Sequence, residues 1–271
     1  GRGENAGSRR SFARPLMFRI VIPARYASTR LPGKPLIEMA GKPMLQWVYG
    51  RALACEAREV LIATDDERIE RVARQFGAEV VMTSVDHVSG TDRIAEVAEL
   101  RGWADDEVVV NLQGDEPSMP AELVSQVAQL LLADPEADIA TLATPIRDRE
   151  EYFDPNAVKV VTDGSGRALY FSRAPIPWFR DGVTEEGGDL GLARRHLGLY
   201  AYRVASLRRL SSLPPAPMEQ AEKLEQLRAL FNGMKILVGE AARRPGPDVN
   251  TLADLAGAEA ALKEDLPSVC D

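Results

Sequence analysis

Residues 18–36 read FRIVIPARYASTRLPGKPL, and this stretch decides the fold class that the sequence predicts. Its first five residues have the apolar, β-branched composition of a buried parallel strand. Pro23 and the small residues that follow Pro23 end this strand. Arg25, Arg30 and Lys34 lie together in the loop that follows. Open α/β sheets bind ligands at the carboxyl ends of their strands, and cations with backbone amides suit a polyphosphate. The stretch therefore predicts a parallel α/β sheet with a triphosphate-binding loop.

A basic surface loop before a helix is the competing interpretation of the same residues. Gly33 and Lys34 stand between Pro32 and Pro35, and these prolines restrict the approach of the lysine, which favours binding. The spacing differs from G-x-x-x-x-G-K-[ST], so the loop would be a phosphate cradle of another kind.

Strands and helices alternate along the first half of the chain. We expect strands at 59–64, 78–83, 107–112 and 138–144, and helices at 43–54, 66–76, 91–101 and 122–133. Such alternation predicts a doubly wound, mostly parallel sheet.

The pattern changes at Val158, where an antiparallel hairpin is expected. The runs 158–163 and 168–172 alternate in polarity on either side of a turn rich in glycine. Beyond the hairpin we expect a strand at 196–203, a helix at 220–231, a strand at 235–238 and a helix at 252–262.

Composition narrows the class of protein. The 271 residues are 45% hydrophobic, and 33 basic against 41 acidic residues give a net charge of −8 without a basic stripe, which argues against a nucleic-acid partner. Two cysteines do not make a disulfide framework or a zinc site. With no apolar run near the ~20 residues that span a bilayer, we expect a cytoplasmic protein without membrane insertion. We expect residues 1–16 to be a disordered tail or an artefact of the assigned gene start.

Asp115 is the candidate metal ligand that the residues themselves indicate. It follows the strand 107–112 in the sequence Gln113-Gly114-Asp115-Glu116-Pro117, at the sheet edge expected to carry the cationic loop. Magnesium prefers one or two carboxylates together with substrate phosphates. A simple Gly-Asp turn is the alternative.

The two histidines have different contexts. His87 is expected to be structural, and it precedes Ser89-Gly90-Thr91, a turn that could cap a helix, contact a base, or do both. His196 follows two arginines and, with Arg173, could form a cationic pocket for a substrate carboxylate, or it could take part in cross-strand charge pairing. The residues around Glu225 and Gln226 resemble an ordinary exposed helix with ion pairs.

Seven motifs in order resemble one known family. They are IPARYASTRLPGKPL (22–36), MTSVDHVSGTDR (82–93), NLQGDEP (111–117), DPNAVKVV (154–161), ALYFSRAPIPW (168–178), RHLGLYAYR (195–203) and LEQLRAL (224–230). Together they resemble the 3-deoxy-manno-octulosonate (Kdo) cytidylyltransferases, the CMP-Kdo synthetases of lipopolysaccharide biosynthesis. The resemblance spans residues 18–255 and implies a cytoplasmic homodimer that joins CTP to Kdo with Mg²⁺, releasing pyrophosphate.

The resemblance also implies a fold and a division of the chain. It indicates a nucleotide-diphospho-sugar transferase fold over 17–271. Residues 17–145 would bind the nucleotide, and residues 146–271 would bind the sugar and supply a hairpin-rich dimerisation element.

Residue roles follow from the resemblance by position. It implies catalytic roles for Arg30, Lys34 and Asp115. It implies nucleotide binding by Pro23, Ala24, Arg25, Ser28, Arg30, Lys34, Ser89, Gly90 and Thr91. It implies sugar binding by Gln113, Arg173, His196, Tyr200, Glu225 and Gln226. Asp115 would be a magnesium ligand.

One position departs from the family pattern. The family has a second metal-binding aspartate in a V-D-T-x-x-D-L motif, and this chain has Asn250 in its place. The metal ligands implied are therefore Asp115 and Asn250, and the amide should bind Mg²⁺ more weakly than a carboxylate. Asp248, two residues earlier, would point the same way in an extended segment and could compensate.

Two alternatives to an active Kdo enzyme remain open at this point. One is a cytidylyltransferase for 8-amino-Kdo, against which Glu116 is a modest argument. The other is a binding protein on the same scaffold, weakened in catalysis by Asn250.

Overall fold

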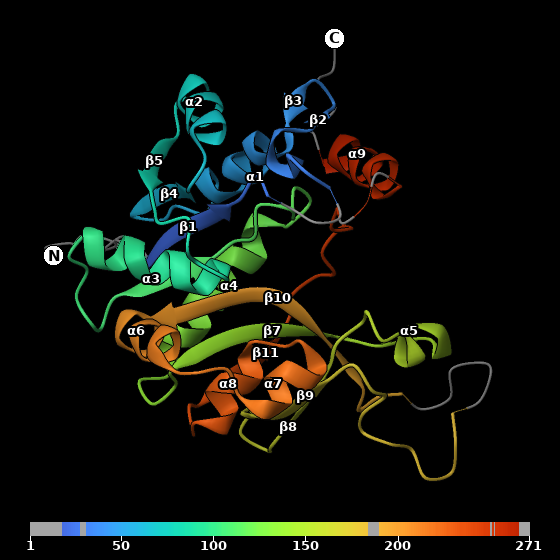
Figure 1. Cartoon of the computed structure of the whole chain (residues 1–271). Helices are drawn as coiled ribbons and strands as arrows, with labels where there is room; N and C mark the ends of the chain where they lie inside the picture. The colour runs from blue at the N-terminus through green and yellow to red at the C-terminus, as the bar shows by residue number, and fades with distance from the viewer. Residues whose placement is uncertain (1–17, 28–30, 184–189, 250, 252, 266–271) are drawn as a thin grey trace, which may run out of the picture.

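The computed structural model describes residues 18–27, 31–183, 190–249, 251 and 253–265. The described part is built on a nine-stranded sheet flanked by helices (Figure 1). Its strands are β1 (Phe18–Ala24), β4 (Glu59–Thr64), β5 (Glu79–Met82), β6 (Val108–Asn111), β7 (Ile139–Pro145), β8 (Lys159–Thr162), β9 (Ala168–Ser172), β10 (Arg194–Arg203) and β11 (Ile236–Glu240). The short strands β2 (Glu38–Met39) and β3 (Lys42–Pro43) pair separately.

The helices of the described residues connect these strands. They are α1 (Met44–Leu53), α2 (Glu67–Gln75), α3 (Gly90–Leu100), α4 (Ala121–Ala133), α5 (Arg149–Phe153), α6 (Val204–Ser212), α7 (Pro217–Glu222), α8 (Gln226–Phe231) and α9 (Asp254–Asp265). A 3-10 turn, η1 (Lys34–Leu36), lies in the cationic loop.

Strand β1 lies inside the sheet and explains why its sequence is continuously apolar. It pairs in parallel with β4 on one side and β6 on the other. Ile20 and Ile22 enter the core that α1, α2 and α4 cover, and Val21 enters the core that α3 and α6 cover. Because helices bury both faces, both sets of alternating side chains must be apolar. The predicted doubly wound sheet is confirmed, with the strand two residues longer than expected.

The sheet order is β11-β7-β10-β6-β1-β4-β5, with the β8–β9 hairpin attached at β10. Strand β10 is antiparallel and lies between β7 and β6. It belongs to the portion after residue 145, so both portions of the chain share one sheet. The predicted hairpin is confirmed: β8 and β9 are antiparallel, and Gly166 donates to the Asp163 carbonyl in the turn.

The single helix expected at 220–231 is wrong. The chain forms α7 and α8 instead, separated at Lys223, whose φ of 55° is left-handed. This break buries Gln226 and makes Glu225 the first residue before α8, so neither belongs to the middle of an exposed helix.

Among the described residues, no helix is both long and apolar enough to cross a bilayer. The expectation for residues 1–16 lies outside the described residues.

Candidate active site

The cationic loop is held by a tight turn at Gly33. Gly33 has a left-handed φ of 70°, and a Cβ atom there would lie 3.1 Å from the Tyr26 ring, so a larger residue would be strained and crowded. Its N–H donates to the Tyr26 carbonyl at 2.9 Å. The turn delivers Lys34, which is buried, toward the sheet edge.

Lys34 and Asp115 meet at this edge. The Lys34 Nζ atom lies 2.6 Å from Asp115 Oδ2, which joins the loop after β1 to the loop after β6. The close approach of the two loops needs Gly114, where a Cβ atom would lie 3.0 Å from the Pro23 carbonyl oxygen. The structure therefore brings the predicted phosphate-binding lysine onto the predicted metal ligand.

The predicted nucleotide turn lies beside β1. Ser89 caps α3 by accepting a hydrogen bond from Asp92 N at 3.1 Å, which confirms the capping interpretation. A Cβ atom at Gly90 would lie 3.2 Å from Pro23, so the helix start and the strand end are in contact. Arg25 donates to the Val88 carbonyl at 3.0 Å. Pro23, Ala24, Arg25 and residues 89–91 thus share one corner of the sheet.

His87 is structural, as expected. Its Nε2 atom lies 2.6 Å from Glu96 Oε2 on α3. Of the other predicted nucleotide and metal residues, Ser28, Arg30 and Asn250 lie outside the described residues.

The segment before Asn250 packs against the Asp115 loop. Val249 N donates to the Asp115 carbonyl at 3.1 Å. Within the described residues, no cluster of three or more His, Cys, Asp or Glu could hold a metal ion. Glu116 follows Asp115 and lies close enough to both Asp115 and Asp248 to feel their charges.

Glu116 is one of the residues of this site to which sequence reasoning gave no binding or catalytic role. Its Oε2 atom is buried and has no hydrogen-bond partner among the described residues. Burial, with the neighbouring charges of Asp115 and Asp248, raises the pKa of the Glu116 carboxyl to about 8. No feature of the motif QGDEP distinguishes a buried second acid from an exposed one.

A pocket of about 280 Å³ lies next to Glu116 and contains three of the six predicted sugar residues. His196, Tyr200 and Gln226 line it together with Glu116 and Arg195. The pocket is therefore formed by β10, the start of α8 and the loop after β6.

His196 does not supply positive charge to this pocket. Its ring is buried, its Nε2 atom lies 3.0 Å from Thr141 Oγ1, and Phe171 packs edge-on against it. Burial lowers the pKa of His196 to about 3, so the imidazole is neutral at pH 7. The predicted cationic role of His196 is wrong, and Arg195 is the cation that lines the pocket.

The other three predicted sugar residues lie outside the lining of this pocket. Glu225 Oε2 accepts a hydrogen bond from Thr91 Oγ1 at 3.2 Å, beside the nucleotide turn, and partial burial raises the pKa of Glu225. Gln113 donates to Asn111 Oδ1 at 3.3 Å, and its Oε1 lies near Gly90. Arg173 donates to the backbone carbonyls of Glu222 and Pro155.

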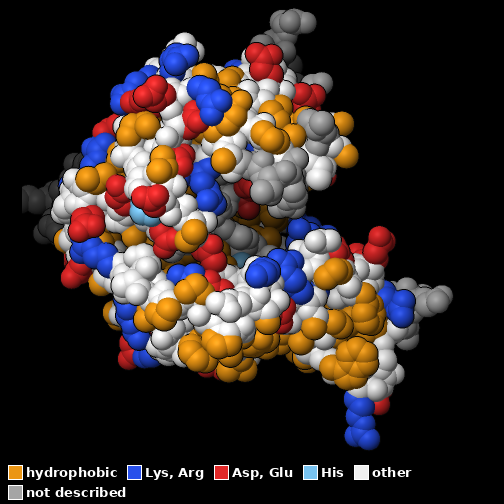
Figure 2. All heavy atoms as spheres, in the orientation of Figure 1, with side chains coloured by type: hydrophobic (Ala, Val, Ile, Leu, Met, Phe, Trp, Pro, Cys, Tyr) orange, Lys and Arg blue, Asp and Glu red, His pale blue; other side chains and the backbone are white. Residues whose placement is uncertain are grey.

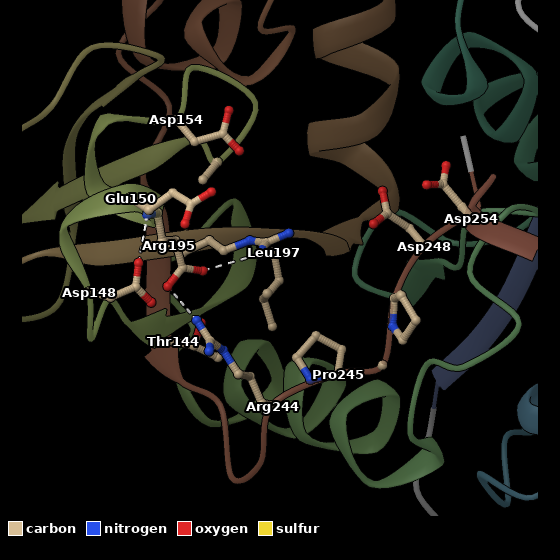
Figure 3. A pocket seen from close by; sticks show the side chains of 14 residues that line it. Thr144, Asp148, Glu150, Asp154, Arg195, Leu197, Arg244, Pro245, Asp248 and Asp254 are labelled. Carbon is tan, nitrogen blue, oxygen red and sulfur yellow. Dashed lines mark hydrogen bonds and ion pairs between the residues drawn. The ribbon is translucent and has the colours of Figure 1, made fainter. Parts of the chain in front are cut away.

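A larger pocket of about 630 Å³ continues from the first and shares Arg195 and residues 245–248 with it. Figure 3 shows Asp148, Glu150 and Asp154 on one side of this pocket and Asp248 on the other. Glu151 forms ion pairs with both Arg195 and Arg244. The two pockets make one polar hollow, which Figure 2 shows between the upper and lower parts of the molecule.

Comparison with known proteins identifies the family of the chain. A cytidylyltransferase family model matches residues 19–236. The 3-deoxy-manno-octulosonate cytidylyltransferase of Halorhodospira halophila is 56% identical over 241 residues, which cover 88% of this chain and 94% of that protein. The enzyme of the same name from Alkalilimnicola ehrlichii is 56% identical over 256 residues, which cover 92% and 98%.

This chain belongs to the 3-deoxy-manno-octulosonate cytidylyltransferase family. It is a nucleotidyltransferase, and the resemblance inferred from its motifs is confirmed. A solved CMP:2-keto-3-deoxy-manno-octonic acid synthetase complexed with CTP has a TM-score of 0.84 and 44% identity, covering 92% of this chain and all of that one. A 4-diphosphocytidyl-2C-methyl-D-erythritol synthase from Anaerococcus prevotii, with a TM-score of 0.58 and 15% identity, shares the fold alone.

Proposed function

We propose that this member of the cytidylyltransferase family transfers CMP from CTP to Kdo, giving CMP-Kdo and pyrophosphate for lipopolysaccharide biosynthesis in the cytoplasm. The observation that carries the proposal is the contact of 2.6 Å between Lys34 and Asp115, at the edge of the hollow that His196, Tyr200 and Gln226 line. The proposed phosphate-binding lysine and the candidate metal ligand are in contact, and Glu116, the residue after Asp115, lines the proposed sugar pocket.

The nucleotide is proposed to lie along the corner formed by the loop after β1 and the start of α3. Arg25 and Lys34, with Ser28 and Arg30, would bind the triphosphate, because guanidinium and ammonium groups neutralise phosphate oxygens. Pro23, Ala24 and Ser89–Thr91 would contact the cytidine. These residues would hold the α-phosphate fixed for in-line displacement.

The chemistry of the donor set fits magnesium. The Asp115 carboxylate already forms an ion pair with Lys34, and the Val249 N–H donates to the Asp115 carbonyl, which fixes the backbone of this residue. Asp115 and Asn250 would hold the ion, and Mg²⁺ when bound would neutralise charge on the phosphate oxygens. The Lys34 ammonium would move from Asp115 toward the leaving pyrophosphate.

The sugar is proposed to occupy the hollow beside the α-phosphate. Arg173 would bind the Kdo carboxylate from beside the lining, because it contacts Pro155 and the next residue, Asn156, lines the pocket. His196 and Tyr200 would be neutral hydrogen-bonding groups, and Gln113, Glu225 and Gln226 would lie around the hydroxyls. Glu225 supports this placement because its contact with Thr91 links the sugar residues to the nucleotide turn.

We also propose a homodimer formed through the portion after residue 145. Among the large apolar side chains of this portion that are exposed in the described structure are Leu169, at 61%, and Trp178, at 70%. Apolar side chains gather along the lower edge of the molecule in Figure 2, beneath α7, α8 and the β8–β9 hairpin. Contiguous exposed apolar surface is typical of a protein interface.

Pyrophosphate release tests the activity. The reaction should need CTP, Kdo and Mg²⁺ together, and Asp115→Ala should lower the rate by at least about 100-fold because a ligand of the metal is removed. Asn250→Asp should reach half-maximal rate at a lower magnesium concentration than the starting protein. Kdo-independent release, or full activity of Asp115→Ala, would contradict the proposal.

A further inference from the structure

Glu222, the last residue of α7, connects two separate segments that carry predicted sugar residues. Ser172 Oγ donates to Glu222 Oε1 at 2.6 Å, and Arg173 N donates to Glu222 Oε2 at 2.9 Å. Both carboxylate oxygens therefore hold the end of β9. Glu225 and Gln226 follow Glu222 within one turn of chain, so the contact joins Arg173 to the break between α7 and α8.

The guanidinium of Arg173 is aimed by backbone groups at the same junction. Its Nε donates to the Glu222 carbonyl at 2.7 Å, and its Nη1 donates to the Pro155 carbonyl at 3.0 Å. Within the described residues no hydrogen bond involves Nη2. Two nitrogens are therefore fixed by backbone carbonyls, and Nη2 could donate to an anion, with which a guanidinium forms strong charge-assisted hydrogen bonds.

Lys159 fixes the backbone of Arg173 from the opposite side. This lysine is fully buried in β8, and its Nζ donates to the carbonyls of Arg173 and Asp154, both at 2.8 Å. Burial lowers the pKa of the Lys159 ammonium. The Arg173 backbone thus has its N–H held by Glu222 and its C=O held by Lys159.

We propose that Glu222 is a positioning residue for the sugar substrate, acting through Arg173. The inference rests on the proposed function, in which Arg173 binds the Kdo carboxylate. Both carboxylate oxygens of Glu222 already accept hydrogen bonds from Ser172 and Arg173, so Glu222 aligns the arginine and does not itself bind the substrate. Without the carboxylate, the Arg173 N–H and the end of β9 are no longer held to α7, so the guanidinium is fixed less firmly and sugar binding loses part of the benefit of preorganisation.

Steady-state kinetics on Glu222 variants separate positioning from simple structural support. Glu222→Ala removes both carboxylate contacts and should raise the KM for Kdo by about tenfold or more, with the KM for CTP unchanged. Glu222→Gln should stay within about threefold of the starting protein, because its carbonyl oxygen can accept from Arg173 N while its amide donates to Ser172 Oγ.

Glu219 offers a matched control on the same helix. It is buried and bonds Arg228 Nε at 2.9 Å, so it fastens α7 to α8 without touching Arg173. Glu219→Ala should lower the melting temperature and leave the KM for Kdo unchanged. An equal rise in the Kdo KM for both alanine variants would overturn the positioning role.

A double-mutant cycle with Arg173→Ala completes the test. If Glu222 acts through Arg173, Glu222→Ala should add nothing to the Kdo KM once Arg173 is alanine. Additive effects, or an unchanged KM in Glu222→Ala alone, would overturn the inference while leaving the proposed function intact. An unchanged Kdo KM in Arg173→Ala would overturn the sugar site of the proposed function itself.

Ser172→Ala is the variant to use if Glu222→Ala does not fold, because it removes only one of the two contacts of the Glu222 carboxylate. A Kdo KM of Ser172→Ala no higher than that of the starting protein would overturn the inference.

Discussion

Lys34 illustrates how one side chain can serve two groups at the phosphate edge. In the described structure its ammonium is buried and neutralises Asp115. A nucleotide triphosphate and a metal ion would together replace this pairing, because each provides an opposite charge for one of the two partners. Under the proposed function, loss of the lysine should therefore affect both phosphate binding and the site of the candidate metal ligand.

Lys34→Met should lower kcat/KM for CTP by about 100-fold, since a preorganised cation at a developing charge stabilises the transition state by several kcal/mol. Initial rates of pyrophosphate release at varied CTP measure the effect. Lys42→Met, which removes an exposed lysine of β3, is the control and should have no effect. A Lys34→Met enzyme within threefold of the starting protein would contradict the role.

His196 should make stability depend on pH in a defined direction. Its folded-state pKa of about 3 lies below its ordinary value of 6.5, so the unfolded chain binds a proton below pH 6.5 that the folded chain does not. The stabilising contribution is complete above pH 6.5 and is lost as the pH falls toward 3. Between pH 7 and pH 5 the loss should be about 2 kcal/mol.

Urea unfolding at pH 7 and pH 5 measures this contribution. His196→Gln lacks the titrating ring, so its free energy of unfolding should fall by about 2 kcal/mol less than that of the starting protein over the same interval. Identical changes in the two proteins would show that His196 titrates normally when folded.

The sequence predicted correctly which residues lie close together where those residues follow the ends of parallel strands. Lys34 and Asp115 each follow a parallel strand, and the carboxyl ends of neighbouring parallel strands meet at one edge. It failed for His196, because adjacent arginines in sequence say nothing about burial of the ring against Thr141 and Phe171. It left Glu116 and Arg195 unassigned, since their place in the pocket depends on the tertiary arrangement.

At the scale of elements, the break between α7 and α8 is the feature that the sequence concealed. The chain has neither glycine nor proline at the break, where Lys223 adopts a left-handed conformation. Helical periodicity continues through it, so pattern reasoning predicts one helix. The break is stabilised by tertiary contacts, among them the clamp of Glu222 on Arg173.

Substitutions at Lys223 should report the strain of this conformation. A β-branched residue is disfavoured at positive φ, whereas glycine adopts it freely. Lys223→Val should therefore unfold at a lower urea concentration than Lys223→Gly, with a difference of about 1–2 kcal/mol in the free energy of unfolding. Equal stability of the two variants would show that the break carries no strain.

Strand order was also beyond sequence reasoning. The strands at 59–64, 79–82, 108–111 and 139–145 were predicted closely because each is an apolar run with clear ends. Strand β10 was predicted as a strand, yet its insertion between β6 and β7 depends on pairing over long sequence distances. Local pattern carries no information on such pairing.

At the scale of the whole molecule, the hollow visible in Figure 2 is lined mainly by the portion after residue 145, with Glu116, Met119 and Thr144 contributed by the portion before it. The nucleotide corner belongs to the portion before residue 145, and Arg173, His196 and Gln226 belong to the portion after it. Strand β10, from the portion after residue 145, pairs with β6 and β7 of the portion before it, so the two portions are joined in one sheet. The division of roles between the portions stays a prediction.

The proposed homodimer should depend on the exposed apolar side chains of the second portion. Light scattering after size-exclusion chromatography should give twice the chain mass of 29.6 kDa. Leu169→Lys combined with Trp178→Glu should give the monomer mass, because buried charges oppose association. Leu53→Lys, at an exposed apolar residue of α1, is the control. A starting protein of monomer mass would contradict the dimer.

The most direct test of the central claim is ³¹P nuclear magnetic resonance of the protein with CTP, Kdo and Mg²⁺. The account predicts loss of the CTP signals, with equal amounts of pyrophosphate and a new phosphodiester signal from CMP-Kdo, only when all three are present. Unchanged CTP, or pyrophosphate formed without Kdo and without the phosphodiester, would contradict it.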